Sequence, residues 1–229
     1  GYASLYSNTT GINNTGIGFF ALFSNTTASN NTAVGYQAGY SNTTGVITAI
    51  GALAGKNYNT SGTETWGSTF VGLSSGDTTT TGVNNAALGG YSLRLNTTGS
   101  QNVALGAAAL YSNTTASNNT AVGYQALTSN TTANNNTAVG YISLRDNTTG
   151  AQNTSVGTGA LANNETASNN TAMGYYAMVN STTGANNVAI GTEALRENTT
   201  ASSNTAVGYQ AGYSVTTGER NTLIGATAG

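Results

Sequence analysis

Residues 121–137 read Ala-Val-Gly-Tyr-Gln-Ala-Leu-Thr-Ser-Asn-Thr-Thr-Ala-Asn-Asn-Asn-Thr, and the same pattern starts again at Ala138-Val139-Gly140. The glycine of this pattern recurs through the chain, and eleven of the thirteen intervals between successive copies are 17 residues. The column includes Gly89, Gly106, Gly123, Gly140, Gly157, Gly174 and Gly191. A fixed period of this length predicts a solenoid in which each repeat forms one coil.

The composition of the repeat decides between helical and extended coils. Gly, Asn, Thr and Ser fill most positions, and these residues favour turns, caps and strands over helix interiors. Short runs such as Asn-Thr-Ala-Val and Tyr-Gln-Ala-Leu, bounded by Gly and by Asn-Thr-Thr, read as two brief strands joined by turns. The sequence therefore predicts an all-β, parallel β-solenoid of about thirteen 17-residue coils with two short strands in each coil.

Two apolar positions recur along the chain and are predicted to form the core. One precedes the glycine and the other follows it by four residues. Their best examples are Val122, Val139, Val156, Leu127, Leu144 and Leu161. Both can face the interior if the glycine bends the chain between them. On this interpretation Val139→Asp would bury an unpaired carboxylate and cost several kcal/mol, whereas Asp146→Asn in a turn would have almost no effect.

Stacked coils place identical residues above one another at a spacing of about 4.8 Å. A recurring polar position would then form an asparagine ladder, at Asn119, Asn136, Asn153 and Asn170. The core is thin, because each coil contributes only two large aliphatic side chains. A thin core favours several chains packing side by side, so the chain's first expected partner is itself, in a homotrimer or a filament.

The organisation is predicted to be one tandem-repeat segment over residues 1–229, without a distinct cap at either end. The only sizeable irregularity is an insertion at residues 56–66, which contains the only Trp. A loop of this kind is a place where a specific contact could be added to a regular scaffold.

Composition excludes several classes of function. Charged residues make up 5% of the chain and the net charge is −2, so there is no basic stripe for a nucleic acid. Cys and His are absent, which removes the usual transition-metal ligands and the commonest general base. The seven acids do not recur as a ladder or pair. We therefore expect no enzyme activity, metal or cofactor, and no membrane insertion within this segment.

The units Asn119-Thr120-Ala121-Val122-Gly123 and Asn187-Val188-Ala189-Ile190-Gly191 resemble the head repeats of trimeric autotransporter adhesins. The chain is also similar to the repetitive shafts of phage tail fibres. This resemblance implies a left-handed β-roll, three chains in each fibre, and attachment to surfaces from an extracellular, cell-surface or virion-surface location. The expected function is a structural and adhesive fibre shaft.

An alternative function uses the outward ladders for binding. Tyrosines recur after the glycine and could stack on cell-surface glycans, and a threonine array could bind ice. The Asn-Thr-Thr turns are also glycosylation sequons. The expected acceptors are Asn8, Asn25, Asn42, Asn96, Asn113, Asn130, Asn147, Asn164 and Asn198.

Overall fold

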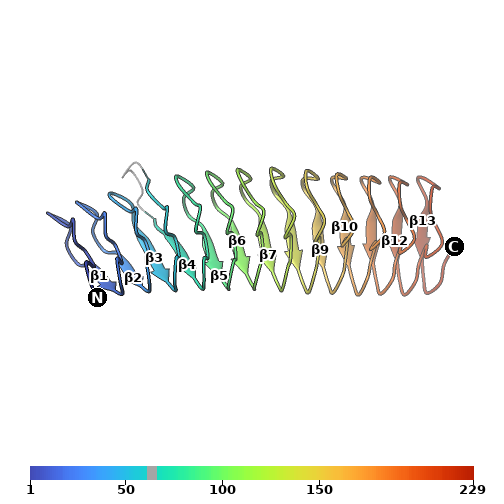
Figure 1. Ribbon diagram of the computed structural model, residues 1–229. Helices are drawn as coiled ribbons and strands as arrows, with labels where there is room; N and C mark the ends of the chain where they lie inside the picture. The colour runs from blue at the N-terminus through green and yellow to red at the C-terminus, as the bar shows by residue number, and fades with distance from the viewer. Residues whose placement is uncertain (61–65) are drawn as a thin grey trace. The chain divides into compact units, whose positions relative to one another are not determined.

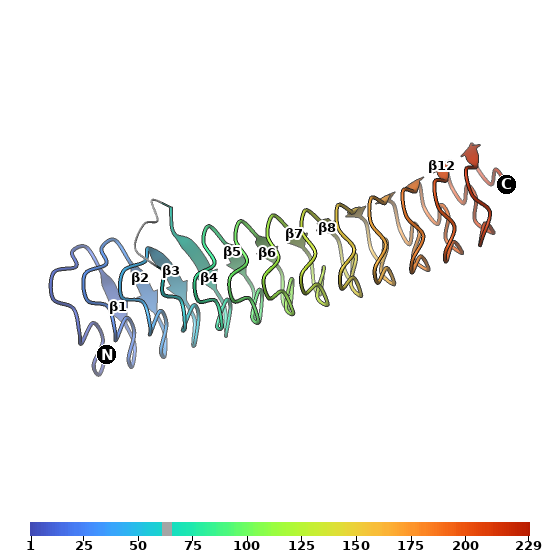
Figure 2. The ribbon, with the colours of Figure 1, turned by 90° about the horizontal axis from the view of Figure 1, so that it is seen from above.

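The computed structural model describes residues 1–60 and 66–229, and it divides into two compact units, Gly1–Asn118 and Asn119–Gly229. Each unit is a parallel β-solenoid in which every turn of the chain adds one short strand (Figure 1). The strands of a unit lie on one side of its coils (Figure 2). No helix occurs among the described residues. The predicted all-β solenoid is confirmed.

The strands follow one another in chain order within each unit. In the first unit they are β1 (Thr15–Ile17), β2 (Thr32–Val34), β3 (Ile47–Ile50), β4 (Ser68–Val71), β5 (Ala86–Leu88) and β6 (Val103–Leu105). In the second they are β7 (Thr120–Val122), β8 (Thr137–Val139), β9 (Thr154–Val156), β10 (Thr171–Met173), β11 (Val188–Ile190), β12 (Thr205–Val207) and β13 (Thr222–Ile224). The register pairs equivalent residues, such as Val139 with Val156.

Each coil contains one strand, so the prediction of two was wrong. The run expected to form the second strand has positive φ at alternate residues, for example 52° at Gln125 and 54° at Leu127. Extended strands require negative φ, so this part of the coil is not a strand. Its backbone alternates between residues with negative φ and residues in the left-handed region, and we call it the zigzag limb. Its backbone still bonds from coil to coil, as in the 3.0 Å hydrogen bond from Leu127 N to Ser143 O.

The recurring glycines form the corner that follows each strand. Gly140 has a φ of 138°, and a Cβ placed there would lie 2.5 Å from the carbonyl oxygen of Gly157. Only glycine combines this backbone conformation with such a close approach of two chains. Glycine therefore recurs at this corner for two reasons, the local bend of the chain and the close contact between neighbouring coils.

The core consists of the middle residue of each strand and the Ala-Leu pair of the zigzag. In the second unit Ala138, Ala126 and Leu127 are fully buried. Leu144 and Leu161 repeat the position of Leu127 and are also fully buried. The predicted leucine column thus faces inward.

The predicted valine column does not face inward, and this is a correction to the expected core. Val122, Val139 and Val156 are each the third residue of a strand and are only half-buried. Side chains alternate along a strand, so a buried middle alanine places both neighbours outside. The corner glycine follows the valine in the chain, so the bend at the glycine does not change the face of the strand on which the valine lies.

Two columns of asparagine complete the interior. Asn153 accepts a 3.0 Å hydrogen bond from Asn170 N at its Oδ1, and it donates a 2.9 Å bond from Nδ2 to Ala167 O. Asn164, from the Asn-Glu-Thr turn, donates a 3.1 Å bond to the same Ala167 carbonyl. Both asparagines are fully buried. The two columns therefore supply donors to carbonyl oxygens that no strand could reach.

The region of the insertion has the bulkiest packing. Tyr58 and Phe70 are fully buried, with ring centroids 5.7 Å apart in an edge-to-face contact. Gly55 and Gly76 lie against Phe70 and leave room for its ring. Trp66 is 75% exposed, and residues 61–65 of the predicted insertion lie outside the described residues.

Candidate interaction surface

Most of the large hydrophobic side chains left exposed lie beside the corner glycines. Of the twenty exposed large hydrophobic residues, fifteen directly precede or follow such a glycine, and we call them the apolar ridge. In the first unit the ridge is Tyr2, Ile17, Phe19, Tyr36, Ile50, Leu73, Leu88 and Leu105. In the second unit it is Tyr124, Tyr141, Met173, Tyr175, Ile190, Tyr209 and Ile224. None of these residues is charged.

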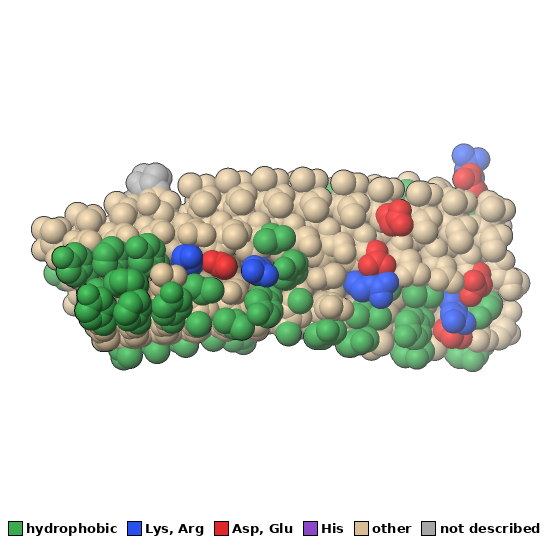
Figure 3. Space-filling view, in the orientation of Figure 1, with side chains coloured by type: hydrophobic (Ala, Val, Ile, Leu, Met, Phe, Trp, Pro, Cys, Tyr) green, Lys and Arg blue, Asp and Glu red, His purple; other side chains and the backbone are tan. Residues whose placement is uncertain are grey.

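Figure 3 shows hydrophobic side chains along the lower edge of each unit, where the strands of Figure 1 end. The exposure is substantial, at 53% for Tyr141 and 42% for Met173. Exposed apolar side chains gathered in this way make the ridge the candidate contact surface of the chain.

Aromatic rings of the ridge stack on one another along the coil direction. Tyr124 and Tyr141 have centroids 5.6 Å apart and an interplanar angle of 12°, and Phe19 and Tyr36 are 5.8 Å apart at 17°. Each of these rings has one face against its neighbour, so the stacked pairs extend the apolar surface from one coil to the next.

A second column, five residues after the glycine, changes chemistry along the chain. In the first three coils it holds Tyr6, Phe23 and Tyr40, stacked at 5.3 and 5.2 Å with interplanar angles of 3°. Figure 3 shows a broad hydrophobic area over the first coils, at the N-terminal end of the chain. The column thereby widens the apolar surface of these coils beyond the ridge itself.

The same column then becomes charged. Lys56, Asp77 and Arg94 occupy it in the next three coils. Arg94 donates a 2.9 Å hydrogen bond to the Tyr111 hydroxyl, and its guanidinium lies over the Tyr91 ring. Burial raises the pKa of Asp77 above its ordinary value, and Lys56 and Arg94 oppose that rise. Lys56 and Arg94 therefore offset part of the cost of burying the Asp77 carboxylate.

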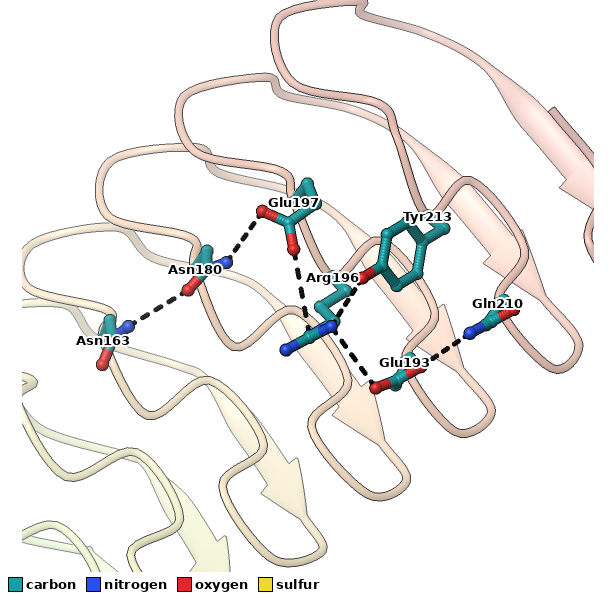
Figure 4. A network of polar contacts seen from close by, with 7 residues as sticks. All are labelled: Asn163, Asn180, Glu193, Arg196, Glu197, Gln210 and Tyr213. Carbon is teal, nitrogen blue, oxygen red and sulfur yellow. Dashed lines mark hydrogen bonds and ion pairs between the residues drawn. The ribbon is translucent and has the colours of Figure 1, made fainter.

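In the second unit a hydrogen-bonded chain crosses several coils (Figure 4). Asn163 Nδ2 donates to Asn180 Oδ1 at 3.3 Å, and Asn180 Nδ2 donates to Glu197 Oε2 at 3.1 Å. Arg196 lies 3.9 Å from Glu197 and 3.5 Å from Glu193. The amide dipoles therefore line up toward a carboxylate whose charge a guanidinium balances.

Arg196 also closes the network on the side of the next coil. Its Nη1 donates a 2.5 Å hydrogen bond to the Tyr213 hydroxyl, and Gln210 donates a 2.7 Å bond to Glu193. Sequence reasoning missed these contacts, although a signal exists: Leu-Arg-x-Asn-Thr-Thr recurs at 93–98, 144–149 and 195–200. The period of 51 residues is three coils, so the arginines mark every third coil.

The sequons chosen from the sequence are in the wrong place for glycosylation. Asn25, Asn42, Asn96, Asn113, Asn130, Asn147, Asn164 and Asn198 are fully buried, and Asn8 is half-buried. Asn147 shows the reason, because its Nδ2 donates to Asn130 Oδ1 at 3.1 Å and to Gly150 O at 2.9 Å. Both hydrogens of the amide are in use inside the coil, so a sugar on this nitrogen would break the packing.

The threonines fall into two groups with different hydrogen bonding. In the turns, Thr148 donates its hydroxyl to Glu165 O at 3.0 Å, as other turn threonines do to the next coil. In the strands, Thr137, Thr154 and Thr171 are in register and face outward, and no hydrogen bond engages their hydroxyls in the described structure. The strand threonines therefore present free hydroxyls to solvent.

No cavity or pocket is found over the described residues, which also hold no cluster of three or more acidic residues that could bind a metal. Among the same residues, none forms a helix long and apolar enough to cross a membrane. Comparisons with protein-family models, with curated proteins and with solved structures give no match. The exposed surfaces of the chain are therefore the features that bear on its function.

Proposed function

We propose that the chain is a structural element of a fibre, in which copies associate side by side through the apolar ridge. The ridge is the observation that carries the proposal, because it leaves regularly spaced apolar side chains in water. The proposed role is mechanical and adhesive rather than catalytic.

The exposed area is sufficient for association. Each ridge residue of the second unit is about half exposed, which corresponds to on the order of 100 Å². Seven such residues offer roughly 700 Å² on one unit, close to the ~800 Å² that each partner contributes to a standard stable interface. The first unit carries a ridge of its own.

Periodicity argues that the partner is a second copy of this chain. Every coil except that of Gly157 contributes one or two side chains to the ridge, and successive coils are about 4.8 Å apart. A surface with the same period can place a side chain against every gap of the ridge, whereas a globular partner would meet only a few of them. The resemblance to adhesin heads and tail-fibre shafts favours three parallel chains on an extracellular, cell or virion surface, where the fibre would serve attachment.

Sedimentation velocity and negative-stain microscopy test this proposal on the purified chain. We expect the wild type to form a discrete oligomer, and Tyr141→Lys combined with Met173→Lys to shift it to monomer. Thr149→Lys together with Thr183→Lys, on exposed turn positions away from the ridge, is the matched control and should leave the oligomer intact. A wild type that stays monomeric at all concentrations would contradict the proposal.

A second candidate function is ice binding by the outward face of the strands. The observation in its favour is the column of strand threonines Thr137, Thr154 and Thr171, whose hydroxyls have no hydrogen-bond partner within residues 1–60 and 66–229. A parallel column that includes Val139 and Val156 lies beside it. Such an array could order water through its hydroxyls and methyl groups. Thermal hysteresis that Thr154→Lys abolishes and Thr149→Lys preserves would support it. If the protein is fully oligomeric and shows no thermal hysteresis, ice binding is excluded. The reason is that association would cover the valine column that ice would have to contact.

A further inference from the structure

The repeat contains two sequons, and the structure separates them. The first begins at the asparagine of the Asn-Thr-Thr turn and is buried, as described above. The second begins one residue before the buried ladder asparagine and includes the first strand threonine. It is present as Asn13-Asn14-Thr15, Asn30-Asn31-Thr32, Asn118-Asn119-Thr120, Asn135-Asn136-Thr137 and Asn169-Asn170-Thr171.

The asparagines of this second sequon occupy a protruding corner of the coil. Asn135 and Asn169 are exposed and have a φ of 62°, a left-handed conformation that asparagine tolerates. The backbone of Asn169 is held by a 3.1 Å hydrogen bond from its N–H to Ala151 O. No described residue forms a hydrogen bond with the side-chain amide of Asn135 or of Asn169. These amides can therefore carry a substituent without breaking any bond of the fold.

We propose that Asn135 and Asn169 are acceptor sites for N-linked glycans. The hydroxyl that completes each sequon, on Thr137 and Thr171, faces outward and has no hydrogen-bond partner among the described residues. The inference is independent of association through the apolar ridge, because these asparagines lie before the strand and the ridge lies after it.

Spacing supports the choice of these two sites in the second unit. Asn135 and Asn169 are two coils apart, and Gln152 occupies the same corner of the coil between them. The acceptors are thus separated by about 10 Å instead of about 5 Å. In the first unit Asn13 and Asn30 are in adjacent coils and are already joined by a 3.2 Å hydrogen bond from Nδ2 to Oδ1. Glycans on neighbouring coils would crowd each other, whereas alternate coils leave room for both.

The test is to secrete the full chain from a eukaryotic cell line and to map glycans on the folded, secreted protein by mass spectrometry. Thr137→Ala and Thr171→Ala each remove one exposed sequon, and alanine is already present at this strand position as Ala86. Thr132→Ala and Thr149→Ala each remove one buried sequon while leaving Asn130 and Asn147 unchanged. The four variants therefore differ only in which sequon is lost.

We expect glycopeptides at Asn135 and Asn169, and loss of one glycan mass in each of the first two variants. The last two variants should keep the wild-type mass. A folded protein that carries glycans on Asn130 or Asn147, or that carries none on Asn135 and Asn169, would overturn the inference.

Discussion

The Asn-Thr-Thr limb of each coil and the strand limb distribute polarity in opposite ways. The turn limb buries polar side chains, such as Asn147 and Asn153, while the strand limb leaves apolar ones, such as Val139 and Ile190, at the surface. The difference follows from the backbone. Turn carbonyls inside the coil need donors from side chains, whereas strand carbonyls are already paired with the next strand. Burial in this fold therefore depends on what the backbone requires at each position more than on hydrophobicity.

Replacing a buried ladder asparagine should have the largest effect on stability. Asn153→Leu leaves Asn170 N without its acceptor and removes one donor from Ala167 O. The unsatisfied Asn170 N–H costs about 1–3 kcal/mol, and Ala167 O, which keeps its bond from Asn164, loses about 1 kcal/mol more, so we expect a loss of up to about 4 kcal/mol in the free energy of unfolding. Urea denaturation measures it. A loss below that of a surface substitution would mean that the ladder is not structural.

Truncating a core leucine should cost somewhat less. Leu144→Ala removes a fully buried side chain from a thin core, and we expect about 3 kcal/mol. The measurement is again the urea midpoint, with Ile142→Ala in the same coil as the half-buried control. Equal losses for the two variants would show that the zigzag limb does not distinguish inside from outside.

A charge in the valine column should hardly affect the folded monomer. Val139→Asp places the carboxylate on the outer face of β8, so we expect a change under about 1 kcal/mol, as for other surface substitutions. Its effect should appear in association, because the side chain lies next to the apolar ridge. Denaturation at a concentration where the protein is monomeric separates the two effects. A loss of several kcal/mol there would restore the original assignment of this column to the core.

The smallest expected effect concerns Asp77. Because its pKa is raised in the folded state, ionisation favours the unfolded chain, and the stability that this group contributes is lost as pH rises above its ordinary value of about 4. Asp77→Asn should therefore be slightly more stable than the wild type at pH 7 and equal to it at pH 3. Asp146→Asn is the control; it removes an exposed pair with Arg145, whose contribution is at most about 1 kcal/mol. A wild type that gained on the variant between pH 3 and pH 7 would contradict the assignment.

Prediction from the sequence succeeded where the repeat itself carries the information. The 17-residue period requires stacked coils, and glycine at the same place in every coil requires a close approach there. Prediction failed for the valines because the buried middle residue of each strand places them on the outer face. It failed for the second strand because every other residue there, such as Gln125 and Leu127, has positive φ. No propensity of glutamine or leucine signals that conformation. The choice of glycosylation sites missed the burial of the Asn-Thr-Thr turns for a related reason. A local motif does not show whether the asparagine amide forms hydrogen bonds with a neighbouring coil.

The amino-acid sequence by itself determined that this chain stacks identical coils, that like residues form columns, and that no charged groove or His/Cys site is available. Only the tertiary structure decided which columns face inward, because that choice depends on where backbone carbonyls lack partners from the adjacent coil. Backbone carbonyls of the strand pair with the adjacent strand, so its valines can be exposed. Carbonyls of the turn lack such partners, so asparagine side chains are buried there to bond with them. The same physical difference leaves the apolar ridge and the outer asparagines free for partners.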